Sequence, residues 1–280
     1  MKLEKLIEDA LYKAIRILPE EVEKAISKAS GTESGEYARY AFEAIGENIE
    51  KARELDLPLC QDTGMFWALC RIGRESRVSL PVLEKAIVKG AGNAAKNGFY
   101  RKSVVSDPVY ERTNTKTNLP AVVNYELQDG KDIDLYFLLK GFGSENCSSV
   151  RMLNPTAGED GVVEAVADIM RKAGGKPCPP VFLGVGIGGT MDRAALLSKK
   201  AFFMSDGSRR MKALSERIRN EVNGLGIGAM GLGGDNTCLS VSILSEPTHI
   251  AGLPVAVTVN CWADRMAHIV IKGGYDEEIS

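Results

Sequence analysis

The chain has 280 residues, 44% of them hydrophobic and 26% charged, so it can bury a sizeable core as one large domain or two modest ones. Its net charge of -2 at pH 7 excludes a broad electrostatic attraction to nucleic acid or to an anionic membrane, and no apolar run is long enough to span a bilayer. The N-terminus is amphipathic and carries acidic residues, unlike a secretory signal, which predicts a cytoplasmic protein.

Apolar residues at helical spacing predict helices over residues 1–18, 34–55, 80–96, 155–173, 191–201 and 208–222, with a short helix beginning near Pro19. Strand-like runs occupy residues 57–59, 65–69, 121–127, 133–139, 181–190, 238–244, 255–260 and 269–271. Asp129-Gly130 between two of these runs predicts a hairpin. The elements predict an α+β fold in a single domain, residues 1–280, with helices packed on mixed or antiparallel sheet.

A polar loop, Cys60-Gln61-Asp62-Thr63-Gly64, stands between two apolar runs. Polar groups in an apolar setting need partners, because burying them unpaired costs several kcal/mol. A bound ligand or metal would supply such partners. The alternative is a turn in which Asp62 and Thr63 form hydrogen bonds with their own backbone, and the loop alone does not decide between the two.

Six cysteines are present without a C-x-x-C pair, which argues against a zinc finger, and only two histidines are present, which argues against a histidine-rich metal site. A cytoplasmic chain of this size is not a disulfide scaffold. A free cysteine is most often a small buried hydrophobe, and Cys70 at the end of an apolar run fits that interpretation.

Two further features are candidate anion sites. Arg101 follows a helix end and either binds a carboxylate through its forked guanidinium or is simply solvated. Gly141 and Gly143 allow backbone N–H groups to approach an anion closely. The glycines of 184–189 lack the dinucleotide-binding spacing, so a nucleotide-binding fold is poorly supported.

Five motifs, taken together, resemble those of a known family. They are Cys60–Gly64, Asn114-Thr115-Lys116-Thr117-Asn118-Leu119-Pro120, Lys140-Gly141-Phe142-Gly143-Ser144-Glu145-Asn146, Pro177-Cys178-Pro179-Pro180 with Gly188-Gly189-Thr190, and Asn260-Cys261-Trp262-Ala263-Asp264-Arg265. In this order they are similar to the iron–sulfur (class I) fumarate hydratases, and most of all to the separate α subunit of the two-subunit form, a group that includes L-tartrate dehydratase. The resemblance covers nearly the whole chain.

The resemblance implies a hydro-lyase that interconverts fumarate and L-malate, or alternatively converts L-tartrate to oxaloacetate, in a cleft that holds a [4Fe–4S] cluster with one open iron. It implies Cys60, Cys178 and Cys261 as cluster ligands, with Cys147 and Cys238 not expected to be ligands. It assigns Asp62 to proton transfer at the substrate hydroxyl, and Gln61, Arg101 and Gly143 to the carboxylates of a small dicarboxylate. The catalytic base is expected on a separate β subunit, in a heterotetramer of two α and two β chains.

Overall fold

The computed structural model describes residues 2–273, and the chain divides into two compact units. Unit 1 comprises the residues up to Pro19, Asn48–Gly141 and those from Arg265 on, and unit 2 comprises Glu20–Glu47 and Phe142–Asp264. Helices packed on mixed sheets confirm the predicted α+β class. The assignment of 1–280 to a single domain stays a prediction.

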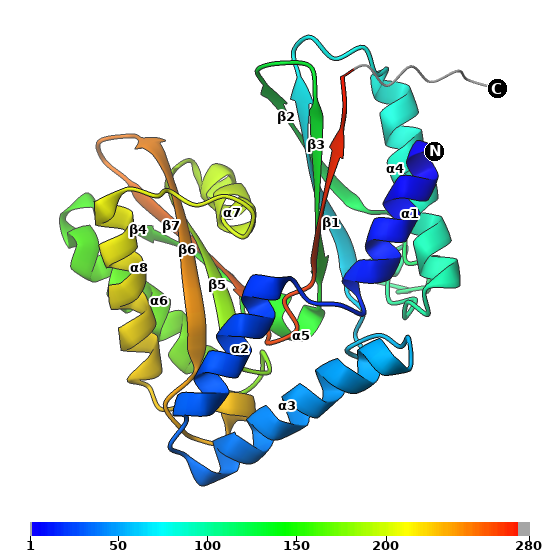
Figure 1. Ribbon diagram of the computed structural model, residues 1–280. Coiled ribbons are helices and arrows are strands. Elements are labelled where there is room, and N and C mark those ends of the chain that lie inside the picture. Colours follow the sequence, from blue (N-terminus) through cyan, green and yellow to red (C-terminus); the bar gives the residue numbers. More distant parts are fainter. Residues whose placement is uncertain (1, 274–280) are drawn as a thin grey trace. The chain divides into compact units, whose positions relative to one another are not determined.

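Unit 1 is built on a four-stranded sheet with the order β2-β1-β3-β8 (Figure 1). Its strands are β1 (Met65–Gly73), β2 (Val122–Gln128), β3 (Ile133–Lys140) and β8 (Met266–Ile271). Helices α1 (Leu3–Ala14) and α4 (Leu80–Asn97) form an apolar core with one face of this sheet. Gly90 of α4 lets the two helices approach closely, because a Cβ there would lie 2.7 Å from the Cβ of Ile7.

Two sequence predictions in unit 1 are wrong. Strands β2 and β3 do not form a hairpin, because β1 lies between them, parallel to β2 and antiparallel to β3. Strand β1 is mostly buried along its length, whereas β2 alternates between exposed and half-buried residues, so β1 occupies an inner position and β2 an edge.

Residues 57–59 form no strand, because the Leu59 N–H donates to Ile15 O and the Leu59 carbonyl accepts from the Asn48 side chain.

Unit 2 contains a second four-stranded sheet, with the order β4-β7-β5-β6. Its strands are β4 (Ser149–Leu153), β5 (Val181–Gly189), β6 (Cys238–Thr248) and β7 (Leu253–Asn260). The longer helices are α2 (Glu20–Thr32), α6 (Gly158–Ala173), α7 (Met191–Lys200) and α8 (Arg209–Asn223), and α3 (Glu36–Glu54) crosses the boundary between the two units. Short turns are α5 (Phe142–Glu145), η1 (Pro155–Ala157) and η2 (Ala229–Gly231).

The sheet of unit 2 is covered on both faces, with α6 and α8 on one face and α7 on the other (Figure 1). Alternate residues of β5 explain this arrangement. Val181, Leu183 and Val185 join the apolar core under α6 and α8. Gly184 and Gly186 face α7, where a Cβ on Gly186 would lie 2.1 Å from a helix carbonyl oxygen. Glycine is therefore required for α7 to lie this close to the strand.

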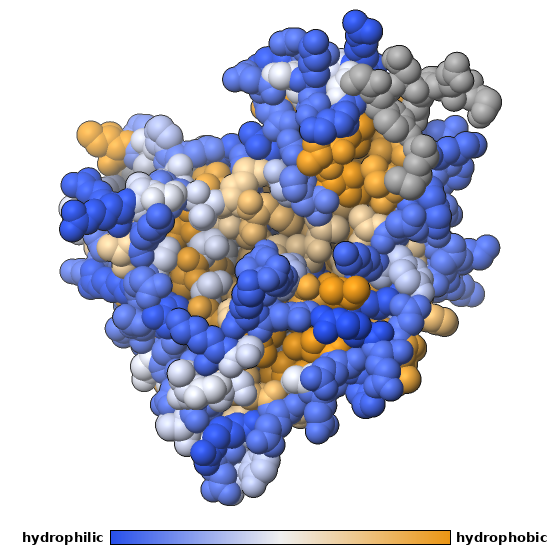
Figure 2. Space-filling model, in the orientation of Figure 1, coloured by the Kyte–Doolittle hydropathy of each residue, from blue (hydrophilic) through white to orange (hydrophobic). Residues whose placement is uncertain are grey.

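The outer side of α8 is mostly hydrophilic, as expected for a helix that buries one apolar stripe (Figure 2). Within residues 2–273, no helix is long and apolar enough to cross a membrane.

Candidate active site

The Cys60–Gly64 loop of unit 1 is tied to the fold at both ends. Leu59 precedes it and is held by the two hydrogen bonds described above, each 2.8 Å long. Gly64 ends it with a φ of 86°, and its N–H donates to Asp62 Oδ1 over 3.1 Å. Asp62 therefore does stabilise its own turn, as the alternative interpretation predicts. The Gln61 side chain beside it is exposed.

The segment that carries Arg101 is joined to this loop. The hydroxyl of Thr63 accepts a hydrogen bond of 2.9 Å from the Arg101 backbone N–H, which lies 38 positions away in the sequence. Thr63 is buried, whereas the Arg101 side chain is exposed. Arg101 thus has a backbone that is fixed to Thr63 and a side chain that is exposed. A guanidinium is the side chain that binds carboxylates in a bidentate way.

Arg265 is a site residue to which sequence reasoning gave no role. Its side chain is 1% exposed, and its Nη1 donates to the Asp62 carbonyl over 2.7 Å. A Cβ added to Gly141 would lie 3.3 Å from Asp62 Oδ2 and 3.5 Å from Arg265 Nη2, so glycine leaves the space that these two groups use. The motif that ends in Arg265 was recognisable, but its contact with a loop 203 residues away was not.

In unit 2, Cys178 and Cys261 lie on neighbouring segments. The N–H of Trp262, next to Cys261, donates to the Cys178 carbonyl over 3.4 Å. The N–H of Met230, in the glycine-rich segment, donates to the Pro179 carbonyl over 2.7 Å. Cys178 is exposed and has a φ of 54°, and Cys261 is half-buried. The glycine-rich segment is thus an ordered support for the Cys178 turn.

Gly143 lies in α5, a single helical turn of unit 2. N–H groups in the first turn of a helix have no partner four residues back, so they are available to an acceptor. The Cys147 thiol donates to the Gly143 carbonyl over 3.3 Å.

Two of the six cysteines are buried thiols, and the other four are half-buried or exposed. Burial raises the pKa of the Cys70 and Cys238 thiols to about 12, which makes both poor sources of thiolate. Cys60, Cys178 and Cys261 are half-buried or exposed. Cys60 belongs to unit 1 and the other two belong to unit 2. Among residues 2–273, no group of three His, Cys, Asp or Glu side chains is assembled closely enough to hold a metal ion.

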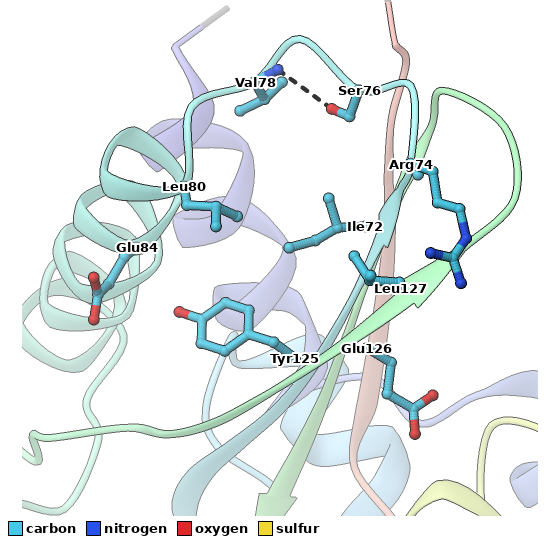
Figure 3. A pocket seen from close by; sticks show the side chains of 10 residues that line it. Ile72, Arg74, Ser76, Val78, Leu80, Glu84, Tyr125, Glu126 and Leu127 are labelled. Carbon is cyan, nitrogen blue, oxygen red and sulfur yellow. Dashed lines mark hydrogen bonds between the residues drawn. The ribbon is translucent and has the colours of Figure 1, made fainter.

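A separate groove of about 450 Å³ lies beside β2 in unit 1 (Figure 3). Ile72, Leu80, Tyr125 and Leu127 line it, and the Ser76 hydroxyl accepts a hydrogen bond from the Val78 N–H at its rim. The groove is lined by none of the residues that the sequence predicts for catalysis, substrate or metal. It is therefore distinct from the candidate active site.

Comparison with known proteins identifies the class of the chain. The family model for fumarate hydratase (Fumerase) matches residues 4–270. The chain therefore belongs to the fumarate hydratase family, whose members are hydro-lyases, and the predicted resemblance is confirmed.

Individual relatives of the chain are named for tartrate dehydratase and not for fumarate hydratase. The chain is 39% identical to the "Putative L(+)-tartrate dehydratase subunit alpha" of Methanocaldococcus jannaschii, over 97% of this chain and 98% of that protein. It is 28% identical to the L(+)-tartrate dehydratase subunit alpha of Escherichia coli K12, over 91% of this chain and 86% of that protein. The strain UTI89 protein of the same name is 30% identical, over 89% of this chain and 84% of that protein.

Proposed function

We propose that this chain is the α subunit of a two-subunit hydro-lyase that reversibly adds water to fumarate and forms L-malate. One observation carries the proposal. The Thr63–Arg101 hydrogen bond joins the segment that carries the exposed Arg101 side chain to the loop that holds Gln61 and Asp62. A dicarboxylate needs a cationic, bidentate partner at one end and an acid–base group at its hydroxyl, and these residues supply both.

The chain's donors fit a [4Fe–4S] cluster, because soft thiolates hold such clusters and Cys60, Cys178 and Cys261 are accessible thiols in the family's motifs. With one iron left without a protein ligand, the cluster would supply a Lewis acid for the substrate hydroxyl. Asp62 would move the proton of the substrate hydroxyl. Arg101, Gln61 and the N–H of Gly143 would hold the carboxylates.

Tartrate is the second candidate substrate, because the relatives described above are named for L(+)-tartrate dehydratase. Loss of water from tartrate is the same elimination on a diacid with one more hydroxyl, and small changes in a pocket accommodate such a group. The same names contain "subunit alpha", which supports a β subunit as the partner. We assign the catalytic base to that subunit.

The cluster assignment is tested with the α and β chains produced together without oxygen. We expect about four irons and matching sulfide per α chain, and depletion of both in Cys60→Ser, Cys178→Ser and Cys261→Ser. Cys147→Ser is the matched control, because Cys147 is also half-buried and lies in a family motif but is not an expected ligand. A cluster content that is indifferent to the three substitutions would overturn the assignment.

The reaction is tested by turnover of fumarate, L-malate and L-tartrate by the same assembly. Faster turnover of fumarate and malate supports the first proposal, and exclusive turnover of tartrate replaces it with the second. Asp62→Asn should lower kcat by at least about 100-fold, because general acid–base groups contribute factors of this order. The iron content should remain that of the wild type, and an unchanged kcat would remove Asp62 from the mechanism.

A further inference from the structure

We infer that Asn118 is a positioning residue that sets the placement of Arg101 relative to Asp62. The inference rests on the roles proposed above for those two residues. Asn118 is completely buried in unit 1, and both ends of its side-chain amide are used. Its Nδ2 donates to the Gly64 carbonyl over 3.1 Å, and its Oδ1 accepts from the Ser103 N–H over 3.2 Å.

Asparagine suits this position for two physical reasons. Its φ is 62°, in the left-handed region that asparagine and aspartate tolerate better than most residues. A neutral amide also offers a donor and an acceptor at once, so it satisfies a carbonyl and an N–H that would otherwise be buried without partners. A carboxylate keeps the acceptor but turns an oxygen toward the Gly64 carbonyl oxygen, and an aliphatic side chain leaves both groups unpaired.

The contacts of Asn118 bracket the two residues that it would position. Gly64 is two residues after Asp62, and Ser103 is two residues after Arg101. Between them, the Thr63 hydroxyl accepts from the Arg101 N–H. The Arg101 backbone is therefore held against the loop by one direct hydrogen bond and by one bridge through Asn118.

The residue before Arg101 is anchored on the core of unit 1. Tyr100 is buried, its hydroxyl donates to the Leu11 carbonyl over 2.8 Å, and its ring lies 5.0 Å from that of Phe66. These contacts hold the segment on the core of unit 1 but do not involve residues 60–64. The hydrogen bonds of Thr63 and Asn118 link residues 101–103 directly to residues 63 and 64, beside the Asp62 turn.

The test compares Asn118→Asp with Asn124→Asp. Asn124 lies on β2 opposite Leu69 of β1, and its Nδ2 donates to the Ala68 carbonyl over 3.3 Å. Both variants exchange a partly or fully buried amide for a carboxylate and lose an amide-to-carbonyl hydrogen bond. A purely structural role predicts that both variants lower only the stability of the chain and leave the kinetics of the folded enzyme alike.

In the assembly of α and β chains, Asn118→Asp should raise KM for the dicarboxylate or lower kcat by on the order of 10-fold to 100-fold, because a misplacement of about 1 Å has effects of this size. Asn124→Asp should change each parameter less than about 3-fold, the margin expected of a substitution outside the site. Equal kinetics for the two variants would refute the inference.

Hydrogen exchange at the Arg101 N–H, resolved by NMR on the α chain, gives a second readout that does not depend on the reaction. The Arg101 N–H donates to Thr63 and not to Asn118. Faster exchange of this N–H in Asn118→Asp, with an unchanged rate in Asn124→Asp, therefore supports coupling between Asn118 and the Arg101 backbone through the loop. Unchanged exchange contradicts it. If the wild-type assembly turns over no dicarboxylate, the proposed function fails, and the Arg101 exchange alone still decides whether Asn118 positions that segment. Asn118→Leu serves as the second variant if Asn118→Asp does not fold.

Discussion

Glu33 is the residue whose replacement tests the structure of unit 2 most directly. Its buried carboxylate accepts four hydrogen bonds. Oε1 accepts from the N–H groups of Gly35 and Asp235 at 2.9 Å each, and Oε2 accepts from the N–H and the side-chain amide of Asn236 at 3.1 and 3.0 Å. The substitution Glu33→Gln keeps the shape of the side chain and removes its charge and one acceptor oxygen.

The expected loss follows from these bonds. The glutamine oxygen retains two of them, and the glutamine NH₂ faces the other two donors. A hydrogen bond to a charged group contributes about 1.5–3 kcal/mol, so losing two predicts about 3–6 kcal/mol, and we expect about 3 because water and side-chain rotation recover part of it. Such a loss is a large fraction of the free energy of unfolding of a typical protein, which is about 5–15 kcal/mol.

The effect should depend on pH with a definite sign. Burial alone raises the pKa of the Glu33 carboxyl, but the hydrogen bonds from Asp235, Asn236 and Gly35 outweigh burial and hold the pKa below its ordinary value of 4.5. A group whose pKa is lower in the folded state stabilises that state above its unfolded pKa and loses this contribution as the pH falls. The difference between wild type and Glu33→Gln should therefore be complete above about pH 5 and shrink below about pH 4.5.

The measurement is urea unfolding of wild type and variant at several pH values, together with hydrogen exchange at the N–H groups of Asp235 and Asn236. Glu36→Gln is the control, because Glu36 is an exposed glutamate nearby in the same unit. The control should change the free energy of unfolding by less than about 0.5 kcal/mol. A Glu33→Gln variant as stable as the control, or a difference that does not vary between pH 3 and 7 (roughly the range of carboxyl titration), would refute this reasoning.

Three other substitutions test separate parts of the fold by the same unfolding assay. Gly186→Ala should cost more than about 3 kcal/mol, because its Cβ would lie 2.1 Å from a carbonyl oxygen of α7, and a neutral result would mean that α7 does not pack there. Tyr100→Phe should cost about 1–2 kcal/mol by leaving the Leu11 carbonyl without its donor, and no loss would contradict that buried hydrogen bond. Ser208→Ala should cost about 1 kcal/mol, because the Ser208 hydroxyl accepts from the Met211 N–H at the start of α8; Ser208→Asp, which keeps an acceptor, should not.

Most helices and strands were predictable because their signal is local. Apolar residues at helical spacing predicted α1, α4, α6 and α8, and the structure confirms them. Strand order was not predictable, because it depends on pairing between distant segments. Asp129-Gly130 joins two strands as predicted, but the buried β1 separates them in the sheet. Periodicity describes the faces of a strand and contains no information about its neighbours.

The candidate site divides in the same way. Residues with reactive groups in short motifs, such as Asp62 and Cys178, were identified from the sequence, and their roles stay predictions. The residues that hold these motifs were not identified. Arg265 contacts Asp62 across 203 positions, and Asn118 contacts Gly64 across 54. Such contacts exist only once the sheets have assembled, so no local pattern predicts them.

The supports of the Cys60–Gly64 loop argue that its geometry matters. Three polar residues at the loop are almost completely buried: Thr63, Asn118 and Arg265 are 2%, 0% and 1% exposed. Asn118 and Arg265 donate hydrogen bonds to carbonyls of the loop, and Thr63, which belongs to the loop, accepts one from the Arg101 N–H. Burying a polar side chain is unfavourable unless its hydrogen bonds are formed, and a buried guanidinium is more demanding still. A loop that served only to connect α3 with β1 would need none of them, because backbone turns and water satisfy ordinary surface loops. Buried Thr63 within the loop, and buried Asn118 and Arg265 outside it, therefore hold the loop in one conformation, and hydrogen-bonded supports of this kind preorganise the groups that a loop carries.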